Sequence, residues 1–443
     1  MHLLKEIWRN LFNRDNFFIL LFVLLVGLGI ANIPVDLDIL NPIEQTTSDF
    51  DITDIYFSKI KSTEKNHEDR ITIVNIGDLS REAIAEQLQI INRYRPRVIG
   101  IDSFFRKLRK DKEAEDSLFA ASLALNPNTV LVTQASYKHN SPELDKEKPS
   151  FDTLELSHPL FEQYAQGGFA NLITSATRQN ILTSDLAGGL ATCRTFSPKE
   201  TINKEVQLAF GVKIAQIYDP EKTRLFLERN NEVEHINFVG NYQSFNILDI
   251  EDLFMMEEEG STEALQNLIE GKIVLLGYMG STINTHSVFD KFYTPLNPNY
   301  IGRAEYDMFG IVVHANIIRM ILEQDYIDEA EDWLDILASL LIGYISIAFF
   351  AFVYRRFGFW YDGISLVTQL LISVFLLYVI ILIFDTYRIR VDWGIGFLAV
   401  VLAPNLLEIY YGVVKRLYER AQERLLHLND KEVPVETEPE QMQ

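Results

Sequence analysis

Four side chains in this sequence could form a binding or catalytic site of an α/β domain. Asp78 and Asp102 each follow a run of β-branched residues that is typical of a strand, and open α/β sheets bind ligands at the carboxyl ends of their strands. Asp290 and His314 lie further along the chain and could approach them. Together the four could form a metal or hydrolytic site. In the alternative that we favour, Asp102 caps a turn and Asn316 bonds the backbone at a helix start, because the spacing does not select metal ligands.

We therefore expect a polar cluster that binds a ligand or stabilises the fold, without a metal or a cofactor. Its candidate members are Asp78, Asp102, Asp290, Thr294, His314 and Asn316. The turn at 277–282 lacks the Gly-Lys-Ser/Thr ending of a phosphate-binding loop. The chain also lacks a nucleophile elbow, a His-Glu-x-x-His helix and a dinucleotide fingerprint. These observations argue against an enzyme.

The elements that must position these side chains follow from the hydrophobic pattern. The residues predict a strand, a helix, a strand, a helix and a strand in the first half, and this order implies a parallel arrangement. The second half repeats the theme as helix, strand, strand and helix. The predicted strands are 71–76, 98–101, 129–134, 235–239 and 272–276, and the predicted helices are 81–94, 111–125, 206–218 and 315–322. The sequence thus predicts one α/β domain with a mixed, partly parallel sheet, and a polar surface loop at 137–150.

Four apolar segments flank this domain, and each is close to the ~20 residues that a membrane-spanning helix needs. One precedes the domain and three follow it, at 17–33, 333–353, 363–384 and 393–414. Most of the basic residues near the segment ends place residues 1–16 and 415–443 in the cytoplasm and residues 34–332 outside. Arg388 and Arg390 argue for the opposite orientation. The first segment could instead be a cleaved signal peptide, but no small-x-small site follows it.

Polar residues occur inside the predicted membrane segments, where they are functional candidates. Gln369 lies in the third segment, and Asn405 and Glu408 share a helix face in the fourth. Two interpretations stay open, namely contacts that pack the helices and contacts that transmit a signal. The tail at 415–443 predicts a helix to residue 427 that could bind a partner, a second copy or the membrane surface, followed by a disordered end.

Composition excludes several classes of protein. The formal charge of −22 argues against nucleic-acid binding, which needs clustered Lys and Arg. Cys193 is the only cysteine, so the chain contains neither an intrachain disulfide nor a thiolate zinc cluster. We expect the protein to meet lipid and an outside ligand instead.

Several short motifs, taken in order, resemble the type-2 CHASE extracellular domain, a sensing module of bacterial cyclases and histidine kinases. The motifs are residues 95–102 (RPRVIGID), 194–196 (RTF), 236–240 (INFVG), 271–277 (GKIVLLG), Asp290 with Thr294-Pro295, and 310–316 (GIVVHAN). The family also places this domain before three membrane helices. The resemblance extends from about Ser48 to Val414.

The resemblance implies a sensor in the inner membrane with its large domain outside. Family members commonly continue into a kinase or cyclase, whereas about thirty residues follow the last apolar segment here, too few for a catalytic domain. We therefore expect a ligand-binding module that signals to a separate cytoplasmic or membrane protein, and a homodimer would suit this role. The alternatives are a structural subunit of an envelope complex and, more weakly, a metal-dependent hydrolase.

Overall fold

A computed structural model describes residues 11–31, 51–61, 67–136, 151–172, 192–283, 285, 289–298 and 305–429. Their contacts divide the chain into two compact units. One unit combines Met1–Asp38 with Glu329–Gln443, and the other is Ile39–Asp328. We call them the membrane unit and the outer domain, and we describe each by itself.

The outer domain is built on a sheet of seven strands in the order β10-β1-β11-β2-β3, with β4 and β5 both paired to β3. All neighbours are parallel except β4, which runs antiparallel to β3. The strands are β1 (Glu68–Asn75), β2 (Val98–Asp102), β3 (Thr129–Ser136), β4 (Thr153–Glu155), β5 (Gln166–Phe169), β10 (Phe245–Leu248) and β11 (Ile273–Gly277). The predicted mixed, partly parallel sheet is confirmed.

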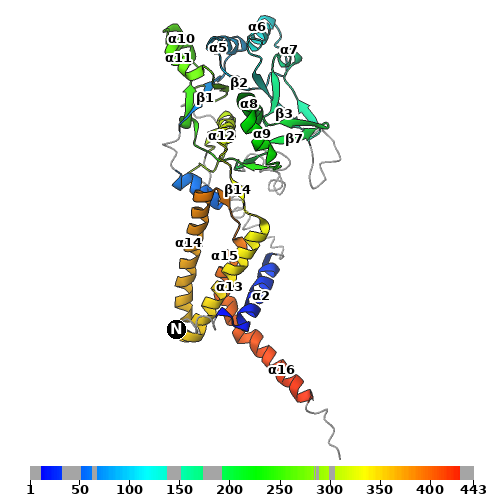
Figure 1. Cartoon of the computed structure of the whole chain (residues 1–443), viewed down its shortest axis with the longest axis vertical. Helices are drawn as coiled ribbons and strands as arrows, with labels where there is room; N and C mark the ends of the chain where they lie inside the picture. Colours follow the sequence, from blue (N-terminus) through cyan, green and yellow to red (C-terminus); the bar gives the residue numbers. More distant parts are fainter. Residues whose placement is uncertain are drawn as a thin grey trace, which may run out of the picture. The chain divides into compact units, whose positions relative to one another are not determined.

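Helices cover both faces of this sheet (Figure 1). Alternate residues along a strand point to opposite faces, so Ile99 and Ile101 join the apolar core under one group of helices, while Gly100 faces the other group. The first group is α5 (Arg81–Arg93), α6 (Glu113–Leu123), α7 (Pro159–Glu162), α10 (Asp252–Glu258) and α11 (Thr262–Ile269). The second group is α8 (Phe210–Tyr218) and α12 (Gly310–Glu323), with α9 (Pro220–Glu228) packed on both.

Short elements complete the outer domain. Three short pairs of strands are antiparallel. They are β7 (Lys199–Ile202) with β8 (Glu205–Leu208), β12 (Lys291–Phe292) with β13 (Met308–Phe309), and β6 (Thr195–Phe196) with β9 (Glu234–His235). The remaining helical turns are α4 (Ile52–Ile55), the π-helical η1 (Tyr56–Ile60) and the 3₁₀ turn η5 (Tyr242–Ser244).

The membrane unit is almost entirely helical. Its elements are α2 (Arg14–Ala31), α13 (Asp332–Phe357), the 3₁₀ turn η6 (Gly358–Trp360), α14 (Tyr361–Tyr387), β15 (Ile389–Arg390), α15 (Gly394–Ile409), the π-helical η7 (Tyr410–Val414) and α16 (Lys415–Asn429). Strand β14 (Asp328–Glu329) pairs with β15. Among the described residues, two stretches are long and apolar enough to cross a membrane, Asp332–Tyr387 and Gly394–Gln422. The first stretch contains both α13 and α14.

Some predicted elements differ from the structure for identifiable reasons. Residues 206–208 belong to the β7–β8 hairpin rather than to a helix, because Asn203 and Lys204 both take the positive φ angles of a tight hairpin turn. In the predicted strand at 235–239 only His235 is in a strand, and the backbone N–H of Val239 donates to the Asn316 side chain instead. The helix predicted at 315–322 begins earlier, at Gly310. The loop predicted at 137–150 lies outside the described residues.

Helix α12 can lie against strand β11 because the strand ends in glycine. A Cβ atom on Gly277 would stand 2.7 Å from Cβ of Ile311 in the first turn of α12, closer than non-bonded carbon atoms approach. The structure therefore requires glycine at this position for steric reasons.

We expect Gly277→Ala to displace the first turn of α12 and to destabilise the outer domain by about 1–3 kcal/mol, the usual cost of overpacking a core. The measurement is the thermal midpoint of the full-length protein in detergent, read from protease resistance of the domain. Gly167→Ala is the matched control, since Gly167 also lies in a strand but is exposed, and a Cβ there would meet its nearest atom, Cγ2 of Thr133, at 3.1 Å rather than 2.7 Å. Equal midpoints for the two variants would contradict the steric argument.

Candidate functional site

Two of the predicted site carboxylates lie at the carboxyl edge of the sheet. Asp102 ends β2 and is in register with Gly277, the last residue of β11. Asp290 takes a positive φ of 54° just before β12, and its backbone carbonyl accepts a hydrogen bond from the N–H of Gly310 at 2.9 Å. Its carboxylate oxygens stand 3.1 and 3.3 Å from the place of a Cβ on Gly310. The first turn of α12 thus holds Asp290, whose charge acts on Asp102, and we call these two carboxylates the acid pair.

The surroundings of the acid pair favour the protonated carboxyl. Burial raises the pKa of Asp102 well above its ordinary value, and the negative charge of Asp290 raises it further. Burial also raises the pKa of Asp290 to about 6. Asp290 nevertheless remains partly open to solvent and Asp102 is only half-buried, so screening by water reduces the energetic consequence of these shifts. Because the charge of one carboxylate disfavours the charge of the other, the protonated form of the pair is favoured as the pH falls.

The other predicted site residues have separate roles. Asp78 is exposed after β1. Thr294 binds Asp307, donating its backbone N–H at 2.8 Å and its hydroxyl to the two carboxylate oxygens. Asn316 is buried and holds the backbone of residues 239–240, because its Oδ1 accepts from Val239 N at 2.7 Å and its Nδ2 donates to Gly240 O at 3.0 Å. Asn316 is thus structural, as the alternative interpretation of the sequence stated for this residue.

His314 belongs to the packing between α8 and α12. Its ring meets the Phe210 ring edge to face, with centroids 5.1 Å apart. Burial lowers the pKa of His314 to about 4, so the imidazole is neutral at physiological pH. In the described part of the chain, no three His, Cys, Asp or Glu side chains are grouped so that they could hold a metal ion. The four-residue metal site suggested by the sequence is therefore not assembled there.

A second polar site holds residues 51–61, which we call the leading segment. Asp54 accepts a two-point ion pair from Arg194, with Nε to Oδ1 at 2.9 Å and Nη2 to Oδ2 at 2.6 Å. Both side chains are largely buried. Phe57 packs edge to face on Phe238, with ring centroids 6.3 Å apart. Because two-point contacts of this kind fix orientation as well as distance, the segment has a defined place on the outer domain.

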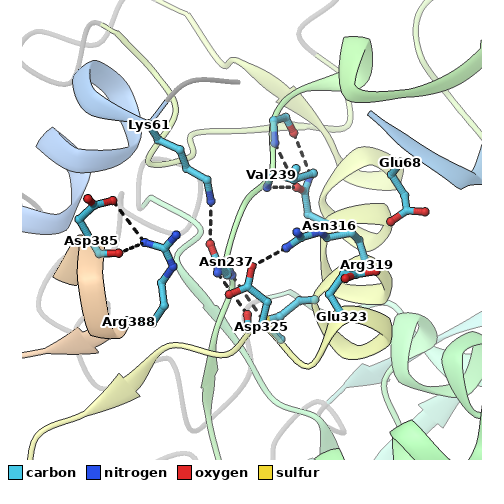
Figure 2. A network of polar contacts seen from close by, with 12 residues as sticks. Lys61, Glu68, Asn237, Val239, Asn316, Arg319, Glu323, Asp325, Asp385 and Arg388 are labelled. Atoms are coloured by element: carbon cyan, nitrogen blue, oxygen red, sulfur yellow. Dashed lines mark hydrogen bonds and ion pairs between the residues drawn. The ribbon is translucent and has the colours of Figure 1, made fainter. Parts of the chain in front are cut away.

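The leading segment ends at Lys61, whose ammonium group donates to Oδ1 of Asn237 at 2.8 Å (Figure 2). Arg194 and Asn237 lie in stretches that the sequence marks only as family motifs, and no pattern in the sequence predicts a role for Asp54 or Lys61. The available signal was the charge complementarity of Asp54 and Arg194, but 140 positions separate them.

The intramembrane candidates do not form one cluster. Gln369 of α14 donates to the backbone carbonyl of Val401 at 2.7 Å, so it joins α14 to α15. Asn405 and Glu408 are exposed on α15. The Gln369 contact packs one helix on another, and for Asn405 and Glu408 both interpretations, helix packing and signal transmission, stay open.

Comparison with protein families decides the relationship. The family model described as the CHASE2 domain matches residues 19–351, three quarters of the chain. The chain belongs to the CHASE2 domain family. CHASE2 is a family of extracellular sensory domains, so the expected resemblance is confirmed. The match runs from α2 into α13 and contains the acid pair and the leading segment. Neither the curated proteins nor the solved structures include a match.

The acid pair predicts a pH-dependent stability for this CHASE2 domain. An unfolded Asp has a pKa of about 3.9, whereas both folded values are higher. The stability contributed by the protonated pair is therefore complete below about pH 4 and is lost as the pH rises through the folded values, near 6 for Asp290.

We expect Asp102→Asn, which removes the charge and keeps the shape, to raise stability at pH 7.5 by about 1 kcal/mol, reduced from the full effect by solvent screening. The same variant should match the parent near pH 4. Protease resistance of the full-length protein during heating measures both. A variant less stable than its parent at pH 7.5 would show that ionised Asp102 has a stabilising partner.

Proposed function

We propose that this chain is a membrane-anchored sensory module that presents its CHASE2 domain outside the inner membrane. The family match carries the proposal, because its members sense extracellular conditions. Apolar helices on both sides of the domain support the anchoring: α2 lies before it, and α13, α14 and α15 lie after it. We propose no catalytic activity for this module.

The proposed topology has four crossings, with both termini in the cytoplasm. Helices α2, α13, α14 and α15 correspond to the four predicted segments. The two arginines that argue for the opposite orientation have local acidic partners: Arg388 lies 3.6 Å from Asp385, and Arg390 lies 3.0 Å from Glu329. Arg355 and Arg356, in the last turn of α13, agree with the proposed orientation.

Labelling with a membrane-impermeant maleimide tests this topology. In a Cys193→Ser background, we expect Asp78→Cys and Tyr387→Cys to react in spheroplasts. Phe359→Cys and Arg420→Cys should react only after the membrane is permeabilised. All four native residues are exposed, so accessibility within the protein does not limit the reaction. Labelling of Phe359→Cys in intact spheroplasts would exclude the pair of crossings made by α13 and α14.

The ligand site that we propose for the sensor is the acid pair at the sheet edge. Support comes from its position at the carboxyl ends of β2 and β11, where open sheets bind ligands. Support also comes from two glycines that lack a side chain at this edge. Gly277 lets Ile311 of α12 approach the strand, and Gly310 lets the Asp290 carboxylate approach the helix. We propose that the membrane helices and α16 pass the response to a separate protein.

Native mass spectrometry of the full-length protein, released gently from its own membrane, tests the sensory proposal. We expect a retained small molecule in the parent and in Asp78→Asn, and its loss in Asp102→Asn. Asp78→Asn is the matched control, since Asp78 also follows a strand but is exposed. An empty outer domain in a fixed assembly with other envelope proteins would instead support a structural subunit.

A further inference from the structure

The outer domain connects to the membrane helices through two stretches of chain. One is the leading segment, residues 51–61, and the other is residues 324–328, which follow α12 and which we call the exit turn. Both belong to the outer domain. The exit turn begins at Gln324, whose left-handed conformation at φ 53° ends α12, and continues to Asp328. Directly beyond it, Glu329 pairs with Arg390 and the N–H of Ala330 donates to the Arg390 carbonyl within the membrane unit.

The side-chain amide of Asn237 joins the leading segment to the exit turn (Figure 2). Oδ1 of Asn237 accepts from Nζ of Lys61 at 2.8 Å, and Nδ2 donates to the backbone carbonyl of Asp325 at 3.2 Å. Asn237 is 1% exposed. Lysine can only donate and a carbonyl can only accept, and the Asn237 amide in this orientation offers an acceptor to the first and a donor to the second.

Helix α12 fixes the exit turn on its other side. Arg319 donates to the Asp325 carboxylate at 2.7 Å, and the Asp325 N–H donates to the Met320 carbonyl at 3.2 Å. The backbone N–H of Asn237 itself points at the sulfur of Met320, 3.4 Å away. The opposite end of α12 is the turn that carries Gly310 beside Asp290. One rigid helix thus runs from the acid pair to the Asn237 amide.

We propose that Asn237 is the positioning residue that makes the two membrane connections of the domain move together. A displacement of the carboxyl end of α12 moves Asp325. Asn237 moves with the Asp325 backbone carbonyl to which it donates. Lys61, which donates to Asn237, transfers the displacement to the leading segment. This regulation rests on the proposed sensory function for its biological meaning. The contact chain itself acts with or without a ligand.

Hydrogen exchange of the full-length protein in detergent tests this coupling. Arg319→Met releases the exit turn without touching the leading segment. We expect faster exchange at residues 324–328 and also, by about threefold, at residues 56–61, which corresponds to the loss of one ordinary hydrogen bond. In Lys61→Met protein, adding Arg319→Met should leave exchange at residues 56–61 unchanged. Because coupling is reciprocal, Lys61→Met alone should speed exchange at the exit turn about threefold.

Two further variants separate coupling from simple loss of structure. Lys59→Met is the matched control, since Lys59 lies in the same segment but donates to the Pro298 carbonyl at 3.3 Å; it should keep the response to Arg319→Met. Asn237→Asp retains an acceptor for Lys61 and places an oxygen against the Asp325 carbonyl, so it should abolish the response. The proposal is overturned if Arg319→Met leaves residues 56–61 unaffected, or affects them equally in Lys61→Met protein. The experiment uses no ligand, so its failure is distinct from failure of the sensory proposal.

Discussion

The packing of α12 into the carboxyl edge of the sheet is the constraint on which the other features depend. Gly277 allows the close contact with Ile311, and the same first turn fixes Asp290 through the N–H of Gly310. About one and a half turns further along α12, the Asn316 side chain forms hydrogen bonds with the backbone of residues 239–240, which a neighbouring strand would otherwise pair. The irregular path of residues 236–240, and with it the position of Asn237, exists because a helix side chain satisfies backbone groups that a sheet would otherwise pair.

The two ends of α12 meet different kinds of chemistry. At its amino end are carboxylates whose environment favours a proton, so the local charge can change within the physiological range. At its carboxyl end, Arg319 holds the Asp325 carboxylate and Lys61 donates to the Asn237 amide. A helix with a proton-binding site at one end and a hydrogen-bonded connection at the other suits the conversion of a local chemical event into a displacement.

The partly parallel sheet, its alternation with helices and the family can be predicted from the sequence, because they depend on local periodicity and on short motifs. The sequence could not place β11 between β1 and β2, since register with Ile71 and Val98 is decided by packing over long separations. The sequence predicts that Asp290 and His314 could approach Asp102. In the structure the charge of Asp290 acts on Asp102, whereas His314 packs on the Phe210 ring and Thr294 bonds to Asp307. The direction in which each side chain points distinguishes the two carboxylates from His314 and Thr294, and the spacing of residues along the sequence does not determine that direction.

The central position of β11 has a consequence for biosynthesis. Ile71 of β1 pairs with Ile273 of β11, about 200 residues later in the chain, and β2 borders β11 on its other side. Until that late strand has been translated, β1 and β2 present open edges that can pair with foreign strands. The domain therefore completes its sheet only shortly before α13 is synthesised. Its yield should depend on chaperones that protect a long, unfinished intermediate.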